Sequence, residues 1–135
     1  MTQEEKQLLL KDLSSRLPYG VIIKTILDNG KLIGFDTERE ELHLRQLNDK
    51  KYRYYTVLND NPKPYLRSLS SMTEEEQKEF IEFHCVTLCP IIIDTCLTVE
   101  NESNMFDWLN AHHFDYHKLI DKGLAIEAPK GMYKN

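Results

Sequence analysis

Residues 21–58 read VIIKTILDNGKLIGFDTEREELHLRQLNDKKYRYYTVL, and this stretch decides the fold class. It consists of short apolar, β-branched and aromatic runs at 21–27, 31–35, 41–47 and 51–58, with polar links between them, a pattern typical of β-strands. The first link, Asp28-Asn29-Gly30, favours a hairpin turn because an Asn-Gly pair tolerates positive φ. We therefore expect an antiparallel meander of four to five strands, or a small, partly open barrel.

A helical pattern precedes this stretch. Thr2 and Glu5 have the spacing of a capping box, in which each side chain binds the backbone N–H of the other residue. Leu9, Leu13 and Leu17 then recur at helical spacing until Pro18 stops the helix. The polar residues between these leucines are expected to face solvent: Lys6, Lys11, Asp12 and Arg16.

Further helices are expected after the sheet. Thr73 and Glu76 repeat the capping-box spacing, and a later helix begins at Ser103 or Asn104. Asp115 is expected to cap a short helix over Tyr116–Lys122, which Gly123 ends in the left-handed conformation. An additional strand is expected at 91–99.

These patterns predict a single α+β domain over residues 1–135: an N-terminal helix, the sheet, and two to three C-terminal helices packed on the sheet. Trp108 is expected at a helix–sheet junction, since a buried indole N–H needs a partner. The expected core comprises Leu9, Leu13, Leu17, Val21, Ile23, Phe35, Leu42, Leu44, Phe80, Phe83, Phe106, Leu109 and Leu119.

Charge and cysteine content restrict the functional classes. The net charge of −5 repels phosphate backbones and anionic lipid, so nucleic-acid binding would need a local basic patch. Three cysteines, an odd number, together with an acidic N-terminus in place of an export signal, favour a reducing compartment, and we expect a cytoplasmic protein. The longest apolar-leaning stretch, 85–99, is interrupted by Pro90 and Asp94, so no membrane span is expected.

Two groups of residues could bind a metal ion. His112, His113 and His117 lie close together in sequence, and imidazole is a common ligand of zinc, but the H-E-x-x-H pattern is absent. The cysteines, Cys85, Cys89 and Cys96, lack the C-x2-C spacing of structural zinc sites and lie in an apolar run. Packing in the core explains both groups better, so we expect neither a metal nor a cofactor.

The segment from Lys50 to Tyr55 is the candidate nucleic-acid site. Its residues Lys50, Lys51, Tyr52, Arg53 and Tyr54 interleave cations with aromatic rings, as sheet-based modules do to hold phosphates and stack bases. On a strand, Tyr52 and Tyr54 share one face while Arg53 and Tyr55 share the other. The alternative is an outer strand on which tyrosines fit a half-buried surface and the lysines oppose edge pairing.

Three segments resemble a recurrent group of small proteins from gut anaerobic bacteria and their prophages. They are KPYLR at 63–67 with SSMTEEE at 70–76, DWLNAHHFDY at 107–116, and GLAIEAP at 123–129 with GMY at 131–133; the opening, 4–20, is also similar. The resemblance implies a phage or mobile-element setting. It implies no activity, cofactor or functional residue, because that group has none assigned.

Three functions are therefore open. The first is a non-catalytic accessory or interaction protein of a phage or mobile element, which predicts an exposed apolar or aromatic patch for a protein partner and no deep polar cleft. The second is a single-stranded nucleic-acid-binding module that uses the Lys50–Tyr55 strand. The third is a small metal-dependent hydrolase built on the three histidines. Since no nucleotide-binding or nucleophile motif is present, the sequence favours a protein that is not an enzyme.

Overall fold

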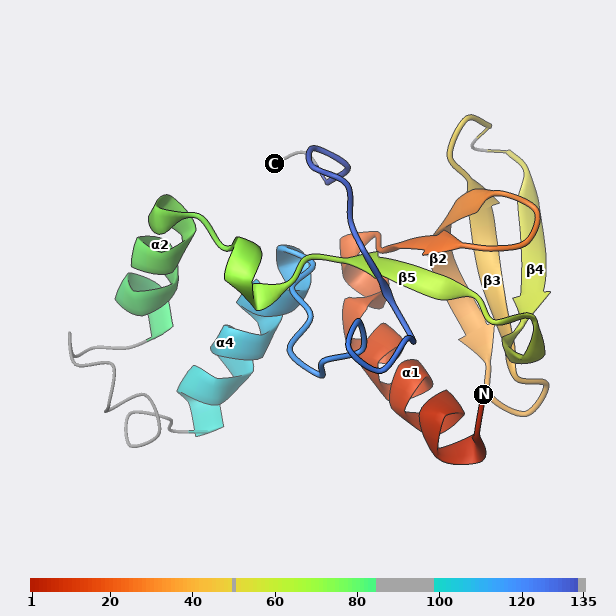
Figure 1. Ribbon diagram of the computed structural model, residues 1–135, viewed down its shortest axis with the longest axis horizontal. Coiled ribbons are helices and arrows are strands. Elements are labelled where there is room, and N and C mark those ends of the chain that lie inside the picture. Colours follow the sequence, from red (N-terminus) through yellow and green to blue (C-terminus); the bar gives the residue numbers. More distant parts are fainter. Residues whose placement is uncertain (50, 85–98, 134–135) are drawn as a thin grey trace.

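The computed structural model describes residues 1–49, 51–84 and 99–133, and within them the chain is α+β (Figure 1). In chain order the elements are α1 (Gln3–Arg16), β1 (Ile22–Lys24), β2 (Asn29–Asp36), β3 (Glu41–Gln46), β4 (Arg53–Val57), β5 (Lys63–Leu66), α2 (Glu74–His84), α4 (Val99–Ala111) and β6 (Ile126–Glu127). Short 3-10 segments occupy Leu17–Tyr19, Leu58–Asp60 and Leu69–Ser71. The strand expected at 91–99 and the cysteine packing fall outside the described residues, apart from Val99, which begins α4.

The sheet has six strands in the order β4-β3-β2-β1-β5-β6. Strands β1 to β4 form the expected antiparallel meander, and β5 pairs antiparallel with the other side of β1. Strand β6 runs parallel to β5, so the sheet is mixed, open and larger than the four to five strands expected. A barrel is not formed. In Figure 1, β4 forms the edge of the sheet that lies farthest from α2 and α4.

The first hairpin turns earlier than the sequence indicated. Thr25 and Asp28 close the turn through a backbone hydrogen bond of 3.2 Å, while Gly30 lies inside β2. A side chain at Gly30 would clash with the Tyr54 hydroxyl, which packs directly over this position. The glycine is therefore needed for close approach of a neighbouring ring and not for positive φ.

Helix α1 is buried on two sides. Its capping box forms as predicted, with Thr2 N donating to Glu5 Oε1 at 2.8 Å and Glu5 N donating to Thr2 Oγ1 at 3.1 Å. Leu9 and Leu13 are fully buried, but Asp12 and Arg16 are fully buried as well. The expectation that these two polar residues face solvent is therefore wrong, because the C-terminal segment covers the side of α1 on which they lie.

Helices α2 and α4 pack against each other. The capping box of α2 forms as predicted, with Thr73 N bonded to Glu76 Oε1 at 3.0 Å and Glu76 N bonded to Thr73 Oγ1 at 3.1 Å. Figure 1 shows both helices beyond the end of β5 and away from β4, not stacked on the sheet as expected. Trp108 accordingly lies at a helix–helix contact, where its Nε1 donates to Glu79 Oε1 at 3.0 Å.

The short helix expected over Tyr116–Lys122 does not form. Asp115 does bind the following backbone, since its carboxylate accepts from Leu119 N at 2.8 Å and Ile120 N at 3.0 Å. However, Lys118 has a φ of 58°, which is incompatible with a helix, and the segment is a series of turns. Gly123 has the expected left-handed conformation, with a φ of 74°.

The expected core is largely confirmed. Eight of the expected residues are buried, and four others are half-buried at the margin of the core. The Phe83 side chain is not among those that the structure describes. The buried eight are Leu9, Leu13, Val21, Ile23, Leu42, Leu44, Leu109 and Leu119; the half-buried four are Leu17, Phe35, Phe80 and Phe106. None of the helices in the described ranges is long and apolar enough to cross a membrane.

Candidate functional site

Two of the three histidines contact carboxylates that lie on different elements. His112 Nδ1 is 3.5 Å from Glu76 Oε2 on α2, and His117 Nδ1 is 2.7 Å from Asp12 Oδ1 on α1. Over residues 1–49, 51–84 and 99–133, no group of three or more His, Cys, Asp or Glu side chains is arranged to hold a metal ion. The fold thus separates the imidazoles that the sequence places close together.

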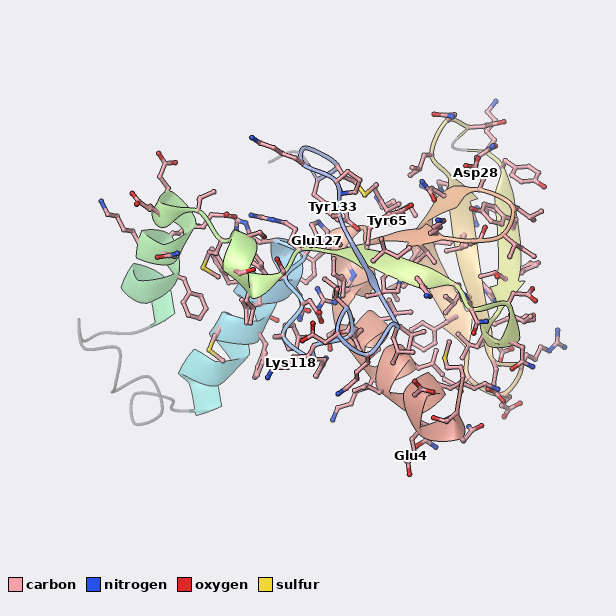
Figure 2. The ribbon with its side chains drawn as sticks, in the orientation of Figure 1. Glu4, Asp28, Tyr65, Lys118, Glu127 and Tyr133 are labelled. Carbon is pink, nitrogen blue, oxygen red and sulfur yellow. The ribbon has the colours of Figure 1, made fainter. Side chains whose placement is uncertain are left out.

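The third histidine, His113, belongs to a buried junction at the C-terminal end of the chain. Its ring stacks on Tyr133 with 3.6 Å between centroids. The Tyr133 hydroxyl accepts from Ile22 N at 2.8 Å and donates to Tyr65 O at 2.7 Å, and Figure 2 shows this tyrosine beside Tyr65. Tyr133 therefore bridges β1 and β5 by its side chain. Burial raises the pKa of Tyr133, and burial together with the nearby Arg16 charge lowers the pKa of His113 to about 4.

A cleft lies between the start of α2 and the C-terminal segment. Its volume is about 570 Å³, and its lining combines charged side chains, such as Arg67, Glu76 and Lys130, with apolar groups of Pro129 and Tyr133. Arg67 Nη1 and Nη2 donate to Glu76 at 2.8 and 2.6 Å, and this pairing lowers the pKa of Glu76 to about 2. The interaction hypothesis expects no deep polar cleft, and this cleft combines apolar with charged groups. Two of its charged side chains, Arg67 and Glu76, neutralise each other.

Another ion pair, between Arg16 and Asp12, is fully buried where the C-terminal segment covers α1. Arg16 Nε donates to Asp12 Oδ2 at 2.6 Å, and Arg16 Nη2 donates to Phe114 O at 2.7 Å. His117 binds the other oxygen of Asp12, and the Tyr116 ring lies 5.0 Å from the Arg16 guanidinium carbon. This network holds two distant parts of the chain together, and its arginine has no solvent-accessible surface for a ligand.

The residues of the candidate nucleic-acid strand do not share one surface. Along β4, Tyr54 and Thr56 are buried, whereas Arg53, Tyr55 and Val57 are exposed, as the predicted alternation requires. Lys51 and Tyr52 precede the strand and are exposed, and Lys50 is outside the described residues. Tyr54 is therefore part of the core, and the exposed aromatic of this strand is Tyr55.

Three cations lie side by side on the outer face of the sheet, opposite α1. Lys31 on β2 is directly across from Arg45 on β3, which is directly across from Arg53 on β4. We call these three residues the cation row. In the described part of the chain, none of them has a carboxylate oxygen within 4.0 Å, although like charges at opposing positions destabilise a sheet.

Exposed apolar side chains gather at the end of the sheet where the two hairpins turn. Ile26 and Leu27, on the β1–β2 turn, are 73% and 75% exposed, while Leu47 and Tyr52, beside the β3–β4 turn, are 44% and 55% exposed. We call these four residues the tip patch. Leu27, Tyr52 and Tyr54 line a common hollow of about 320 Å³. Exposed apolar side chains that form a contiguous patch can mark a binding surface.

The turn that carries Ile26 and Leu27 is held by polar contacts. Thr25 Oγ1 accepts from Leu27 N at 3.2 Å and from Asp28 N at 3.0 Å, and it donates to Asp28 O at 2.6 Å. The Tyr54 hydroxyl also donates to Asp28 O, at 3.2 Å. Figure 2 shows Asp28 at this end of the sheet. The turn is therefore fixed without burial of its two apolar side chains.

Comparison of the chain with protein-family models, with curated proteins and with solved structures finds no match. The geometry of this structure is therefore the main basis for inferring the function.

The sequence reasoning missed the tip patch because it assigned Ile26 and Leu27 to the first strand. A signal was nevertheless present. Thr25 and Asp28 flank the two apolar residues, and a Thr side chain that binds the backbone three residues ahead favours a turn over an extended strand. Two apolar residues at the apex of such a turn cannot pack into the core of their own sheet.

We expect the stability of the protein to fall in two stages as the pH is lowered. The His113 pKa is about 4 in the folded chain and near 6.5 when unfolded, so the unfolded chain binds the proton first and stability falls between about pH 6.5 and 4. The Glu76 pKa is about 2 when folded and near 4.5 when unfolded, so its contribution is full above 4.5 and is lost toward pH 2.

Urea denaturation at a series of pH values measures both stages. His113→Asn should flatten the upper stage, and asparagine suits the positive φ of 63° at this position. Glu76→Gln should flatten only the lower stage. An unchanged slope above pH 4.5 in His113→Asn would show that this imidazole is not buried in its neutral form.

Proposed function

We propose that this chain is a non-catalytic interaction protein that binds an apolar segment of a protein partner at the tip patch. The observation that carries the proposal is the exposure of Ile26 and Leu27, about three-quarters of each side chain, on a turn fixed by hydrogen bonds. The resemblance to small proteins of gut anaerobes and their prophages supports a partner from a phage or mobile element.

The energetic argument is that a fixed turn binds at low entropic cost. Fully burying a Leu or Ile side chain contributes about 1.5–3 kcal/mol, and the backbone that presents these two residues loses little freedom on binding. The hollow between Leu27 and Tyr52 can receive apolar side chains of the partner. Asp28 and Gln46, which also line the hollow, supply polar groups to it.

Catalysis is less well supported by the described residues. The cleft beside the start of α2 holds Arg67 and Glu76 bonded to each other, and the buried Arg16 on α1 is bonded to Asp12. Charged groups that satisfy each other within the fold serve stability more readily than they serve a substrate.

A second candidate function is the binding of single-stranded nucleic acid on the outer face of the sheet. The observation that favours it is the cation row, Lys31, Arg45 and Arg53, which has no carboxylate partner within the described ranges, with Tyr55 beside it and 65% exposed. Phosphates could neutralise the row while bases stack on the tyrosine. Tyr54, which the sequence suggested for stacking, is buried and is replaced by Tyr55 in this hypothesis.

One set of variants separates the two candidates. Proteins captured from the source cells by the wild-type chain are identified, and their affinity is measured for Leu27→Asp, for Arg53→Ala and for the control Leu69→Asp, an exposed leucine outside the patch. We expect Leu27→Asp to weaken binding by about tenfold or more, while the other two variants bind normally.

The same variants are titrated with a labelled single-stranded oligonucleotide at low and high salt. Salt-sensitive binding that Arg53→Ala weakens and Leu27→Asp leaves intact would support the second candidate instead. Equal partner affinity for Leu27→Asp and for wild type would disprove the proposal for the tip patch.

A further inference from the structure

Within residues 1–49, 51–84 and 99–133, strand β4 is an edge of the sheet, and the residues that carry its outward backbone groups can be named. The hydrogen bonds at the two ends of its pairing run from Gln46 N to Tyr52 O, at 3.0 Å, and from Leu58 N to Glu40 O, at 2.8 Å. Because backbone groups alternate along an antiparallel strand, the even-numbered residues of β4 direct their N–H and C=O toward β3. The odd-numbered residues, Arg53, Tyr55 and Val57, direct theirs away from the sheet, and no described strand pairs with them.

We infer that β4 pairs antiparallel with β4 of a second copy of this chain, with the two-fold axis at Tyr55. This register opposes Tyr55 to Tyr55 of the second copy and opposes Arg53 to Val57 of the second copy. It is the register in which all five residues of β4 are paired and the outward N–H and C=O groups of Arg53, Tyr55 and Val57 all find partners. The two sheets would form one continuous sheet with a common outer face.

Charge complementarity supports a second copy over an unrelated strand. The outer face is basic at one end of the strands, where the cation row lies, and acidic at the other, where Val57 is opposite Glu41 and Glu41 is opposite Asp36. Antiparallel pairing about Tyr55 brings these ends together. On one line across the joined sheet, Lys31, Arg45 and Arg53 of one copy are then followed by Val57, Glu41 and Asp36 of the other copy.

The reach of the side chains fits this arrangement. Neighbouring strands are about 4.8 Å apart, so Glu41 of the second copy lies about 10 Å from the Arg53 backbone. The aliphatic part of Arg53 can cover Val57 of the second copy while its guanidinium approaches this carboxylate. Such pairing explains why three cations stand in line without a carboxylate partner in the described part of the single chain. At the centre, the exposed Tyr55 ring, which already meets His43 edge-on at 4.7 Å, would meet its own copy.

The inference does not depend on the proposed function, since Ile26 and Leu27 of the tip patch lie on the β1–β2 turn, away from the paired β4 edge. The two copies would carry their tip patches at opposite ends of the joined sheet. An interaction protein of this form would be bivalent.

Analytical ultracentrifugation and amide hydrogen exchange test the pairing directly. We expect a concentration-dependent dimer of two 15.9 kDa chains between about 10 μM and 1 mM, since an edge contact is a small interface. The amides of Arg53, Tyr55 and Val57 should become protected as the concentration rises. The amides of Tyr54 and Thr56 should be protected throughout, because they face β3. A monomer at every concentration, or a dimer in which the three outward amides stay unprotected, would overturn the inference.

Variants test the register. Tyr55→Lys places two cations opposite each other and should raise the dissociation constant of the dimer about tenfold or more, whereas Tyr55→Phe keeps the ring and should pair as wild type does. In Arg53→Glu, the new carboxylate approaches Glu41 of the second copy, so repulsion between the two negative charges should also dissociate the dimer. Combining it with Glu41→Arg should restore pairing. Failure of this charge exchange to restore a dimer lost in Arg53→Glu would exclude the proposed register.

Discussion

Replacing Arg16 with alanine is expected to lower the free energy of unfolding by about 3–5 kcal/mol, because it leaves the carboxylate of Asp12 buried without its main counter-charge. Both side chains of this pair have no exposed surface, and the two bonds between them measure 2.6 and 3.1 Å. Arg16 also donates to Phe114 O at 2.7 Å, so the substitution removes a bond between α1 and the C-terminal segment. Urea denaturation at neutral pH measures the loss.

Two further variants separate the lost ion pair from lost packing. Arg16→Lys keeps the charge but not the two-pronged geometry, and it should recover only part of the stability. Combining Asp12→Leu with Arg16→Met removes both charges and fills the space, and it should be clearly more stable than Arg16→Ala alone. A loss below about 1 kcal/mol for Arg16→Ala would mean that Asp12 is hydrated and that the pair is not buried.

Replacing Phe114 with alanine is expected to cost about 3–5 kcal/mol, because the ring is fully buried and several groups pack directly on it. The Arg67 guanidinium carbon lies 4.2 Å from the ring centroid, and the Trp108 ring is stacked nearly parallel at 5.8 Å. Its backbone is also fixed, since Phe114 N donates to Leu109 O at 2.9 Å. Truncation would leave a cavity where α4, β5 and the C-terminal segment meet.

Two control variants accompany Phe114→Ala: one removes an exposed aromatic ring, and the other replaces Phe114 with a residue that keeps most of the apolar volume. Tyr52→Ala removes a ring that is 55% exposed and should change stability by less than about 1 kcal/mol. Phe114→Leu retains most of the apolar volume and should cost less than Phe114→Ala. Equal midpoints of unfolding for Phe114→Ala and Tyr52→Ala would remove this ring from the core.

The features that were predictable are those whose signal and structure lie within a few residues. The capping boxes at Thr2 and Thr73, the stop at Pro18 and the alternation of β4 are all present in the fold. Each depends on hydrogen bonds between residues three apart, on the fixed ring of proline, or on the two-residue repeat of a strand. Nothing distant in the chain can easily reverse such local preferences.

The candidate sites were harder to predict because their composition depends on long-range pairing. The cation row joins residues from three strands, and only the register of β2, β3 and β4 aligns them. The histidines near the C-terminal end were grouped by sequence, yet the backbone directs them to α2, to α1 and to Tyr133. A positive φ at His113 turns the chain between the histidines, a second at Lys118 turns it directly after His117, and the sequence carries no strong signal for either.

The sequence by itself determined that this chain is α+β, with a capped helix before a four-stranded meander and a capped helix after it, because short-range hydrogen bonding and side-chain periodicity specify those elements. Only the tertiary structure decided that β5 joins the far side of β1, that β6 runs parallel to β5, and that the Tyr133 hydroxyl links β1 to β5. It also decided that Asp12 and Arg16 are buried. The physical reason is that a charged side chain enters the core only when a distant segment supplies the matching groups, and no local pattern records which segment that is.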